Sequence, residues 1–240
     1  RLDGEDYYDK TYTRTHFDKL DYNFSLKPAK DLNIEITGNK INTRSLAQQL
    51  DIRFDSTDPE GNGFIDESIP AFITGNFSTS YSMFSTAFKN GDQLFDQLRA
   101  NRIAISRRLG AQAGIDVDDP ANINPLDGTV VGFGTNSQDV LLPSFLAAYS
   151  GKNANNVKLG IFRDIPIPAW NLRYTGFMKY KWFKENFSSF SLTHGYKSSY
   201  TVSSFTNNLQ FDDNNPTITN AAGDFESRTL VSSATLVDEF

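Results

Sequence analysis

The sequence predicts a mainly β protein, and three observations lead to that prediction. Aromatic residues make up 13% of the 240 residues, including 20 Phe and 10 Tyr, and aromatic residues are enriched in strands. Several stretches alternate apolar and polar side chains, which is the period of a strand with two unlike faces. No window reaches the ~18 consecutive apolar residues that a membrane-spanning helix needs. A helical membrane protein is therefore excluded, whereas a β-type membrane protein is not.

Charge and cysteine content exclude further classes. The formal net charge of -6 argues against a nucleic-acid partner, because phosphate binding needs a basic face. Without cysteine there are no disulfides, thiol nucleophiles or Cys-ligated zinc sites. The chain opens at Arg1 without an initiator Met or a signal segment, so we expect it to be a section of a longer protein.

Residues 1–50 predict a lead segment and a β-hairpin. Pro28 is expected in the turn, where its missing N–H costs nothing. Pairing Leu26 with Leu32 in this hairpin places Phe24 opposite Ile34, and Tyr22 opposite Ile36. One face then carries only apolar side chains, namely Leu20, Tyr22, Phe24, Leu26, Leu32, Ile34 and Ile36. The other face is polar and consists of Asn23, Ser25, Asn33, Glu35 and Thr37.

Residues 51–160 predict a loop and helix insertion. Residues 51–67 and 116–127 are expected to be loops, with a strand candidate at 76–84 between them. A helix is expected from Asp92, as its N-cap, to about Gly110, because apolar residues recur there at near-helical spacing. A shorter helix is expected over residues 140–149, begun by Pro143 and ended at Gly151.

Residues 161–240 predict strands again, with a polar loop at 207–224. Trp170, Leu172 and Tyr174 alternate with polar residues. The longest alternating run covers residues 189–202, and it exceeds both the ~5 to 6 residues of a usual strand and the ~9 to 11 that cross a bilayer. A weaker strand is expected at 229–237.

The alternation has two interpretations that the pattern by itself does not separate. In a soluble sheet the apolar face packs on a core, whereas in a membrane barrel it meets lipid and the polar face lines a watery interior. The Ser/Thr-rich parity of residues 189–201 suits a barrel, with Tyr196 and Tyr200 in an aromatic girdle. Soluble sheets also commonly expose Ser and Thr, so both interpretations stay open at this point.

No catalytic, cofactor or metal site is predicted. Residues Asp58, Glu60, Asn62, Gly63, Ile65 and Asp66 match six positions of a calcium loop. The twelfth position is Ile69, which supplies no carboxylate, so a solvated acidic loop over residues 55–67 is the preferred interpretation.

The other polar residues do not form the sets that a metal site or a catalytic site requires. His16 and His194, the two histidines, lie far apart in sequence and offer little to a metal site or a catalytic triad. The glycines of the DGTVVGFGTNS segment lack the Lys and the spacing of a phosphate loop, so we predict turns there. Asp118 and Asp119 lie in a loop without an expected aromatic pocket, so no glycosidase is predicted.

Five stretches of the chain resemble a known family. They are LDYNFSLKPAKDLNIEITGNK from Leu20, MFSTAFKNGD from Met83, NSQDVLLPSFLAAYSGKN from Asn136, LGIFRDIPIPAWNLRYTGFMK from Leu159 and WFKENFSSFSLTHGYKSSYTVSSF from Trp182. Together they closely resemble the later part of the SprA family, the outer-membrane translocon of the type IX secretion system in gliding bacteria. Family members are far longer than this chain, and residues 51–76, 116–125 and 207–224 lie outside the resemblance.

The resemblance implies a fold and a function. It implies a section of a very large antiparallel transmembrane β-barrel with helical and loop insertions, which exports folded cargo proteins across the cell outer membrane and serves gliding motility. Its implied partners are a PorV-type barrel partner at a lateral opening, a periplasmic plug protein, secreted cargo with a C-terminal signal domain, and membrane lipid. No enzymatic activity and no cofactor are expected.

We therefore expect the apolar hairpin face to meet lipid and the polar face to line the interior, with the helical insertion outside the membrane. The alternative is a soluble periplasmic or surface β-sandwich that binds glycan or protein. A calcium-stabilised adhesin is a second alternative.

Overall fold

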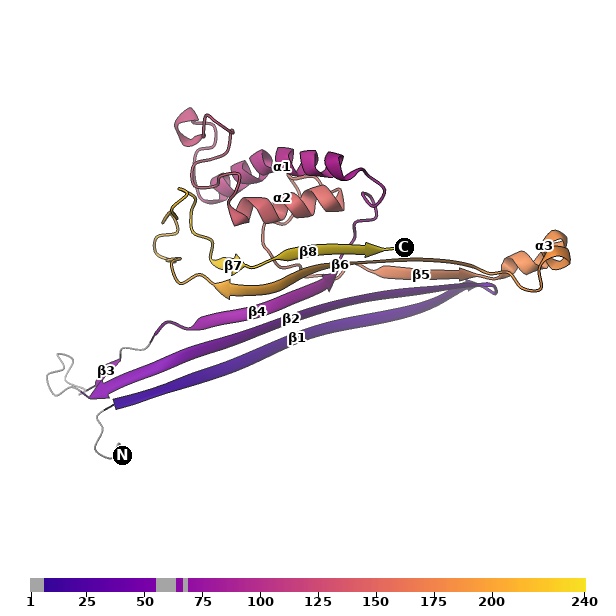
Figure 1. Cartoon of the computed structure of the whole chain (residues 1–240), viewed down its shortest axis with the longest axis horizontal. Coiled ribbons are helices and arrows are strands. Elements are labelled where there is room, and N and C mark those ends of the chain that lie inside the picture. The colour runs from indigo at the N-terminus through magenta and orange to yellow at the C-terminus, as the bar shows by residue number, and fades with distance from the viewer. Residues whose placement is uncertain (1–6, 55–63, 67–68) are drawn as a thin grey trace.

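A long antiparallel sheet with one helical layer forms the described part of the chain (Figure 1). The structure is a computed structural model that describes residues 7–54, 64–66 and 69–240. The strands are β1 (Tyr7–Ala29), β2 (Leu32–Phe54), β3 (Phe64–Asp66), β4 (Phe72–Ser80), β5 (Ala169–Tyr174), β6 (Leu192–Asn207), β7 (Thr229–Val231) and β8 (Ala234–Glu239). The α-helices are α1 (Gly91–Gln112), α2 (Gln138–Ser150) and α3 (Lys181–Asn186), and two short 3₁₀ helices lie at η1 (Pro120–Asn122) and η2 (Gly176–Lys179). The mainly β prediction is confirmed.

Strands β1 and β2 form the predicted hairpin, but in a different register. Phe24 lies opposite Ile36, and Tyr22 lies opposite Gly38, so the predicted pairing is wrong by two residues. The turn falls at residues 30–31, and Pro28 lies within β1 beside an irregularity in the pairing, not in the turn. Because a shift of two residues preserves side-chain parity, the apolar and polar faces are those that the sequence predicts.

Strands β4 and β5 occupy a single position in the sheet. Strand β2 pairs with β4 through Lys40 and Thr79, and with β5 through Thr37 and Ala169. Strand β6 also pairs with both of them, in the same antiparallel sense. The chain therefore leaves one strand after Ser80 and resumes it at Ala169, and residues 81–168 are an insertion into that strand. The predicted strand at 76–84 is thus shifted to Phe72–Ser80, and it belongs to the sheet although it lies inside the predicted 51–160 insertion.

The two predicted helices of the insertion are present, with different starts. Asn90, not Asp92, caps α1, because its side chain accepts a hydrogen bond of 3.1 Å from the amide of Asp92. Pro143 lies inside α2 and does not begin it, whereas Gly151 ends the helix as predicted, with a φ of 67° in the left-handed region. The structure also places α3 between β5 and β6, and sequence alternation does not predict it. Across the described residues, none of the helices is both long and apolar enough to traverse a bilayer.

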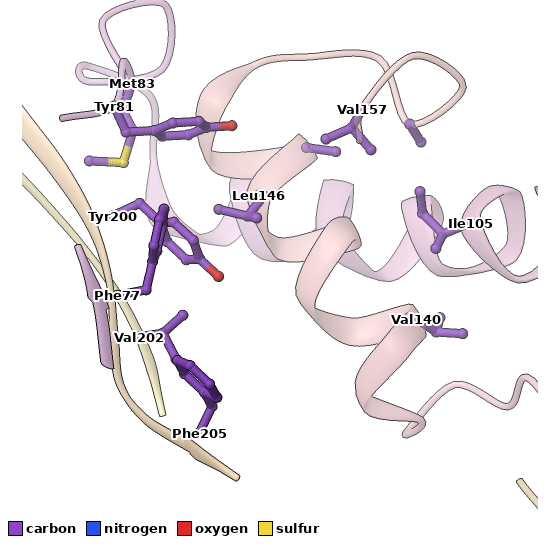
Figure 2. Close-up of a cluster of buried hydrophobic side chains, with 12 residues drawn as sticks. Phe77, Tyr81, Met83, Ile105, Val140, Leu146, Val157, Tyr200, Val202 and Phe205 are labelled. Carbon is purple, nitrogen blue, oxygen red and sulfur yellow. The ribbon is translucent and has the colours of Figure 1, made fainter. Parts of the chain in front are cut away.

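The core lies between the helical layer and one face of the sheet. Figure 2 shows side chains of the sheet, including Phe77, Tyr200 and Val202, pointing toward the layer that carries Leu146 and Ile105. These side chains are almost fully buried. Apolar burial of this kind stabilises by about 25 cal/mol per Å². The helical layer is therefore attached to the sheet by a hydrophobic core of its own.

The buried cluster corrects one expectation about the sheet. Tyr196 and Tyr200 are predicted to lie in a lipid-facing girdle, but they are 2% and 0% exposed beneath the insertion. The hydroxyl of Tyr196 accepts a hydrogen bond of 2.7 Å from the amide of Met83 in the inserted segment. Alternation identifies the apolar parity of a strand and does not identify the material that covers it, which is why the prediction is wrong at these two residues.

Candidate functional surfaces of the sheet

The uncovered face of the sheet is lined by hydroxyl groups. A row of directly opposed residues crosses four strands, from Thr15 in β1 through Ser45 and Thr74 to Thr206 in β6. The Thr15 and Ser45 side-chain oxygens lie 3.0 Å apart in a hydrogen bond. A second hydroxyl pair, Ser78 and Thr201, has the same 3.0 Å distance. We call this surface the hydroxyl face, and its Ser and Thr members include Thr15, Ser25, Thr37, Thr43, Ser45, Thr74, Ser78, Ser199, Thr201 and Thr206.

Charged and apolar side chains share the hydroxyl face with these groups. Glu35, Arg173 and Lys197 carry charges of both signs on it. Phe17 and Ile41 interrupt it with apolar side chains. The face is therefore wettable and mixed in charge, and it has no single strong electrostatic preference.

The opposite face is apolar near the β1–β2 turn. Phe24, Ile36, Trp170 and Tyr196 oppose one another in one row across four strands, and Leu26, Ile34, Leu172 and His194 form the next row. Phe24 is 57% exposed, and Leu26 and Leu192 are also exposed. We call this surface the apolar band, and it consists of Leu20, Tyr22, Phe24, Leu26, Ile34, Ile36, Leu172 and Leu192.

The apolar band has a defined length along the strands. On β1 the side chains of this face are polar beyond Leu20, at Asp18 and His16. On β2 they are polar at Lys40 and Asn42. From Leu20 to the turn the band occupies about the 9 to 11 residues that span a bilayer when tilted. It is therefore a local feature of two strands that are each 23 residues long.

The helical layer begins where the apolar band ends. The Phe84 ring lies 5.2 Å from that of Trp170 and 5.3 Å from that of Tyr196, centroid to centroid. Tyr22 also reaches the insertion, because its hydroxyl donates a hydrogen bond of 3.0 Å to the carbonyl of Pro166. The insertion thus covers the apolar side chains of β4, β6 and β8, and it leaves those of the β1–β2 hairpin uncovered (Figure 1).

An aromatic and basic loop lies beyond the other end of the band. This aromatic loop, residues 175–191, contains η2 and α3 and connects β5 to β6 at the far end of the sheet (Figure 1). The Phe183 ring lies 5.1 Å from Phe177 and 5.0 Å from Phe190, while Trp182 is 60% exposed. Lys179 forms an ion pair with Asp31 of the hairpin turn, and this hydrogen bond raises the pKa of Lys179. The loop is therefore tied to the β1–β2 turn.

The polar residues that the sequence offered as site candidates do not lie close together in the structure. His16 pairs with Asp18 at 2.9 Å on an exposed strand, and His194 lies opposite Leu172 at the apolar band. Asp119 accepts a hydrogen bond from the amide of Ala121, so it caps η1. Within the described residues no group of three His, Asp or Glu side chains is placed to hold a metal ion.

Two glycine and loop predictions have different outcomes. Gly128 and Gly132 have φ values of 75° and 86°, which agrees with their predicted place in turns. The calcium-loop candidate falls mostly outside the described residues, and only its Ile65 and Asp66 lie in β3.

Both long edges of the sheet are open within the described part of the chain. Strand β1 pairs only with β2, and β8 pairs only with β6. An open edge presents a row of backbone N–H and C=O groups that can pair with a further strand.

Comparison with known proteins adds no identification. No family model matches the chain, and no curated protein matches it.

Proposed function

We propose that this chain is a section of the wall of a protein-conducting outer-membrane β-barrel that exports folded cargo, as its resemblance to the SprA family implies. The observation that carries the proposal is the opposite character of the two faces at the hairpin end. There the apolar band is exposed over about one bilayer thickness, and the hydroxyl face lies behind it on the same strands.

In this proposal the apolar band meets lipid, and the hydroxyl face lines the pore. A neutral, hydrated wall of Ser and Thr side chains lets a folded protein pass without adhering to it. The chain's role is passage and gating, without covalent chemistry. The open edges at β1 and β8 suit pairing with further strands of a larger barrel.

The rest of the hairpin has a place in the same proposal. Because β1 and β2 are each 23 residues long, they extend well beyond a bilayer. The hairpin beyond the apolar band lies in water, alongside β4 and β6, where the helical layer covers Phe77, Tyr200 and Val202. The aromatic loop lies at the opposite membrane boundary, where Trp, Tyr and Lys side chains are favoured.

The proposed partners follow from the resemblance and from these surfaces. A PorV-type barrel would lie at a lateral opening, a plug protein would close the pore from the periplasm, and cargo with a C-terminal signal domain would pass along the hydroxyl face. Lipid contacts the apolar band.

A soluble binding module is the second candidate, and one observation favours it. The inserted helices bury Phe77, Tyr200 and Val202 in a core like that of a water-soluble α/β layer. In that case another protein surface, and not lipid, covers the apolar band.

Paired substitutions on the hairpin separate the two candidates. In the barrel, Phe24→Arg places a charge in lipid and costs about 2–4 kcal/mol, whereas Ser25→Arg on the other face is nearly neutral. The measurement is the free energy of unfolding of the chain folded in phospholipid vesicles. Equal effects of the two substitutions, together with a wild-type chain that stays soluble without detergent, would reject the barrel.

A further inference from the structure

A polar groove of about 560 Å³ lies on the helical layer, between α1 and the end of α2. Its lining is made mainly of carboxamides and alanines. The carboxamides are those of Gln93, Gln97, Asn101, Asn153 and Asn155. The groove shares no residue with the hydroxyl face or the apolar band, so it has no part in the proposed export function.

Hydrogen bonds within the layer fix both walls of the groove. The two helices lie side by side (Figure 1), and the carboxamide of Asn101 in α1 donates a hydrogen bond of 3.3 Å to the carbonyl of Ser144 in α2. After α2 the chain turns back along α1. There the Arg108 guanidinium donates to the carbonyls of Ala154 and Val157, the latter at 2.9 Å. The groove therefore keeps its shape without a ligand.

The carboxamides of α1 form a row with nearly the repeat of an extended peptide. Gln93, Gln97 and Asn101 are four residues apart, so they lie on one face of the helix at intervals of about 6 Å. Alternate residues of an extended chain repeat every ~6.6–6.8 Å. A carboxamide both donates and accepts, so it can bond the C=O and the N–H of a peptide backbone. Successive members of the row therefore match alternate residues of a strand laid along α1.

Two members of this row have free hydrogen-bonding atoms that a ligand can reach. Gln93 and Gln97 are both exposed. Among the described residues, the Gln93 carboxamide has no hydrogen-bond partner. Gln97 donates one bond of 2.9 Å to the side-chain oxygen of Asn101, which leaves its own oxygen and its second N–H free. Asn101 is buried, so its role is to hold Gln97 in position.

The floor of the groove admits a backbone at close range. It is lined by small side chains, namely Ala100, Ala104, Ala147, Ala148 and Ala154. Small residues let another backbone approach closely. None of the described lining residues is aromatic, so a sugar ring finds no face on which to stack. From Gln93 to Ala104 the α1 wall rises about 16 Å, the length of about five residues of extended chain.

One end of the groove is positively charged. Lys89 lies just before α1 and Lys152 just after α2. These two segments meet, because the hydroxyl of Ser85 donates a hydrogen bond of 3.0 Å to the carbonyl of Ser150. Neither lysine forms an ion pair within the described residues, and the described lining includes no carboxylate. A carboxylate on a bound ligand would therefore meet two uncompensated cations at this end.

We infer that this groove binds an extended peptide segment that carries an acidic side chain. The carboxamides of Gln93 and Gln97 bond the peptide backbone, the alanine floor admits it, and Lys89 and Lys152 attract its carboxylate. Its volume falls within the ~300–1,000 Å³ range of ligand sites. None of these contacts requires a membrane, so the inference stands apart from the proposed function.

Titration calorimetry on the purified chain in a non-ionic detergent tests the inference with four probes. The peptide acetyl-AEAEA-amide should bind, and its neutral counterpart acetyl-AQAQA-amide should bind about three- to fivefold more weakly. The AEAEA peptide with N-methylated peptide bonds has no backbone donors, and trigalacturonate is an acidic sugar. Neither of these two should give a response. No binding of AEAEA, equal binding of AQAQA or of the N-methylated peptide, or tighter binding of the sugar would overturn the inference.

A substitution assigns the binding to the carboxamide row. Gln93→Leu removes a carboxamide that has no partner in the protein, and it should weaken AEAEA binding by about five- to tenfold. Gln112→Leu is the matched control, because Gln112 is exposed on the same helix but outside the groove. It should leave the affinity unchanged. Both variants should melt at the wild-type temperature, because both side chains are exposed.

A second substitution tests the charged end. Lys89→Met should weaken AEAEA binding by about threefold and leave AQAQA binding unchanged, and added salt should cause a similar loss in the wild type. Lys27→Met, on the exposed hairpin, is the control and should affect neither peptide. Unchanged AEAEA affinity in Gln93→Leu, or an equal effect of Lys89→Met on the two peptides, would overturn the inference.

Discussion

The side-chain oxygen of Ser80 accepts a hydrogen bond of 2.6 Å from the backbone amide of Asn39. The same hydroxyl lies 3.0 Å from the Asn39 carbonyl, to which it donates. Ser80 is the last residue of β4, where the chain turns away from the sheet. The amide of Ile167 donates a bond of 3.0 Å to the Ser80 carbonyl as the chain returns. A side chain therefore takes the place of a ladder partner at the break between β4 and β5.

Removal of this hydroxyl should destabilise the sheet at the break. Ser80→Ala leaves the Asn39 amide without its partner at a part-buried position, and we expect a loss of about 1 kcal/mol in the free energy of unfolding. Ser78→Ala is the control, because its hydroxyl pairs with Thr201 on the more exposed hydroxyl face, and it should cost about 0.5 kcal/mol. Denaturant unfolding measures both. Similar losses in the two variants would show that Ser80 has no special role.

Two strand glycines should respond differently to an added methyl group. A Cβ atom at Gly75 would lie 2.2 Å from the backbone carbonyl oxygen of Thr43 and 2.4 Å from the Phe205 ring. Because the carbonyl belongs to the sheet ladder and cannot rotate away, Gly75→Ala should cost about 1–3 kcal/mol. Gly195→Ala meets only the Trp170 carbonyl, at 3.8 Å, and should be nearly neutral. Thermal unfolding of both variants checks this, and a neutral Gly75→Ala would mean that the strands separate more easily than their pairing suggests.

Two carboxylates of the insertion should give pH dependences of opposite sign. Hydrogen bonds from Thr129 lower the pKa of Asp127 below its ordinary 3.8, so the folded state favours the charged form. The stability from Asp127 is present above pH 3.8 and is lost as the pH falls through the lowered value. Asp127→Asn should therefore cost about 0.5 kcal/mol at neutral pH, a value discounted for solvent exposure, and nothing in strong acid.

Asp139 has the reverse behaviour. Burial raises its pKa above 3.8, although a hydrogen bond with Ser227 opposes the shift. The folded state then binds the proton more tightly, so this stability is present below pH 3.8 and is lost as the pH rises through the raised value. Asp139→Asn should be more stable than the wild type at neutral pH, and the gain should vanish in acid. The measurement is the melting temperature of each variant relative to the wild type across the acid pH range. A difference that changes with pH in the same direction for both variants would contradict the opposite pKa shifts of Asp127 and Asp139.

The aromatic loop should enter a membrane interface. The chain has two tryptophans, and Trp182 on α3 is exposed, whereas Trp170 packs against Phe84. On folding into anionic vesicles, Trp182 fluorescence should shift to shorter wavelength and be quenched by lipids brominated near the headgroup. Lys184→Glu should weaken this association by about 1 kcal/mol per charge removed.

Trp182→Phe and Trp170→Phe are matched variants that assign the signal. Loss of the vesicle response in Trp182→Phe, and its retention in Trp170→Phe, is the expected pattern. The reverse pattern, or no shift in either variant, would place the loop in water.

Much of the fold could be predicted from local pattern. Period-2 alternation identifies the turn half of the β1–β2 hairpin over residues 20–37, and it identifies β5 and most of β6, but not residues 7–19 of β1 or 38–54 of β2. It also identifies the two unlike faces, because parity survives a shift of two residues in register. The α1 and α2 helices are predicted by apolar spacing and by Gly151. Their first residues, Gly91 and Gln138, differ from the predicted ones. At α1 the reason is that the side chain of Asn90, and not that of Asp92, accepts the hydrogen bond from a free amide.

The sequence by itself determined which side chains share a face, because parity is a local property of an extended backbone. Only the tertiary structure decided that β4 and β5 are one interrupted strand, and that residues 81–168 cover Tyr196 and Tyr200. These are contacts between residues far apart in the chain. Their free energy comes from apolar area buried between segments, which no short sequence window contains.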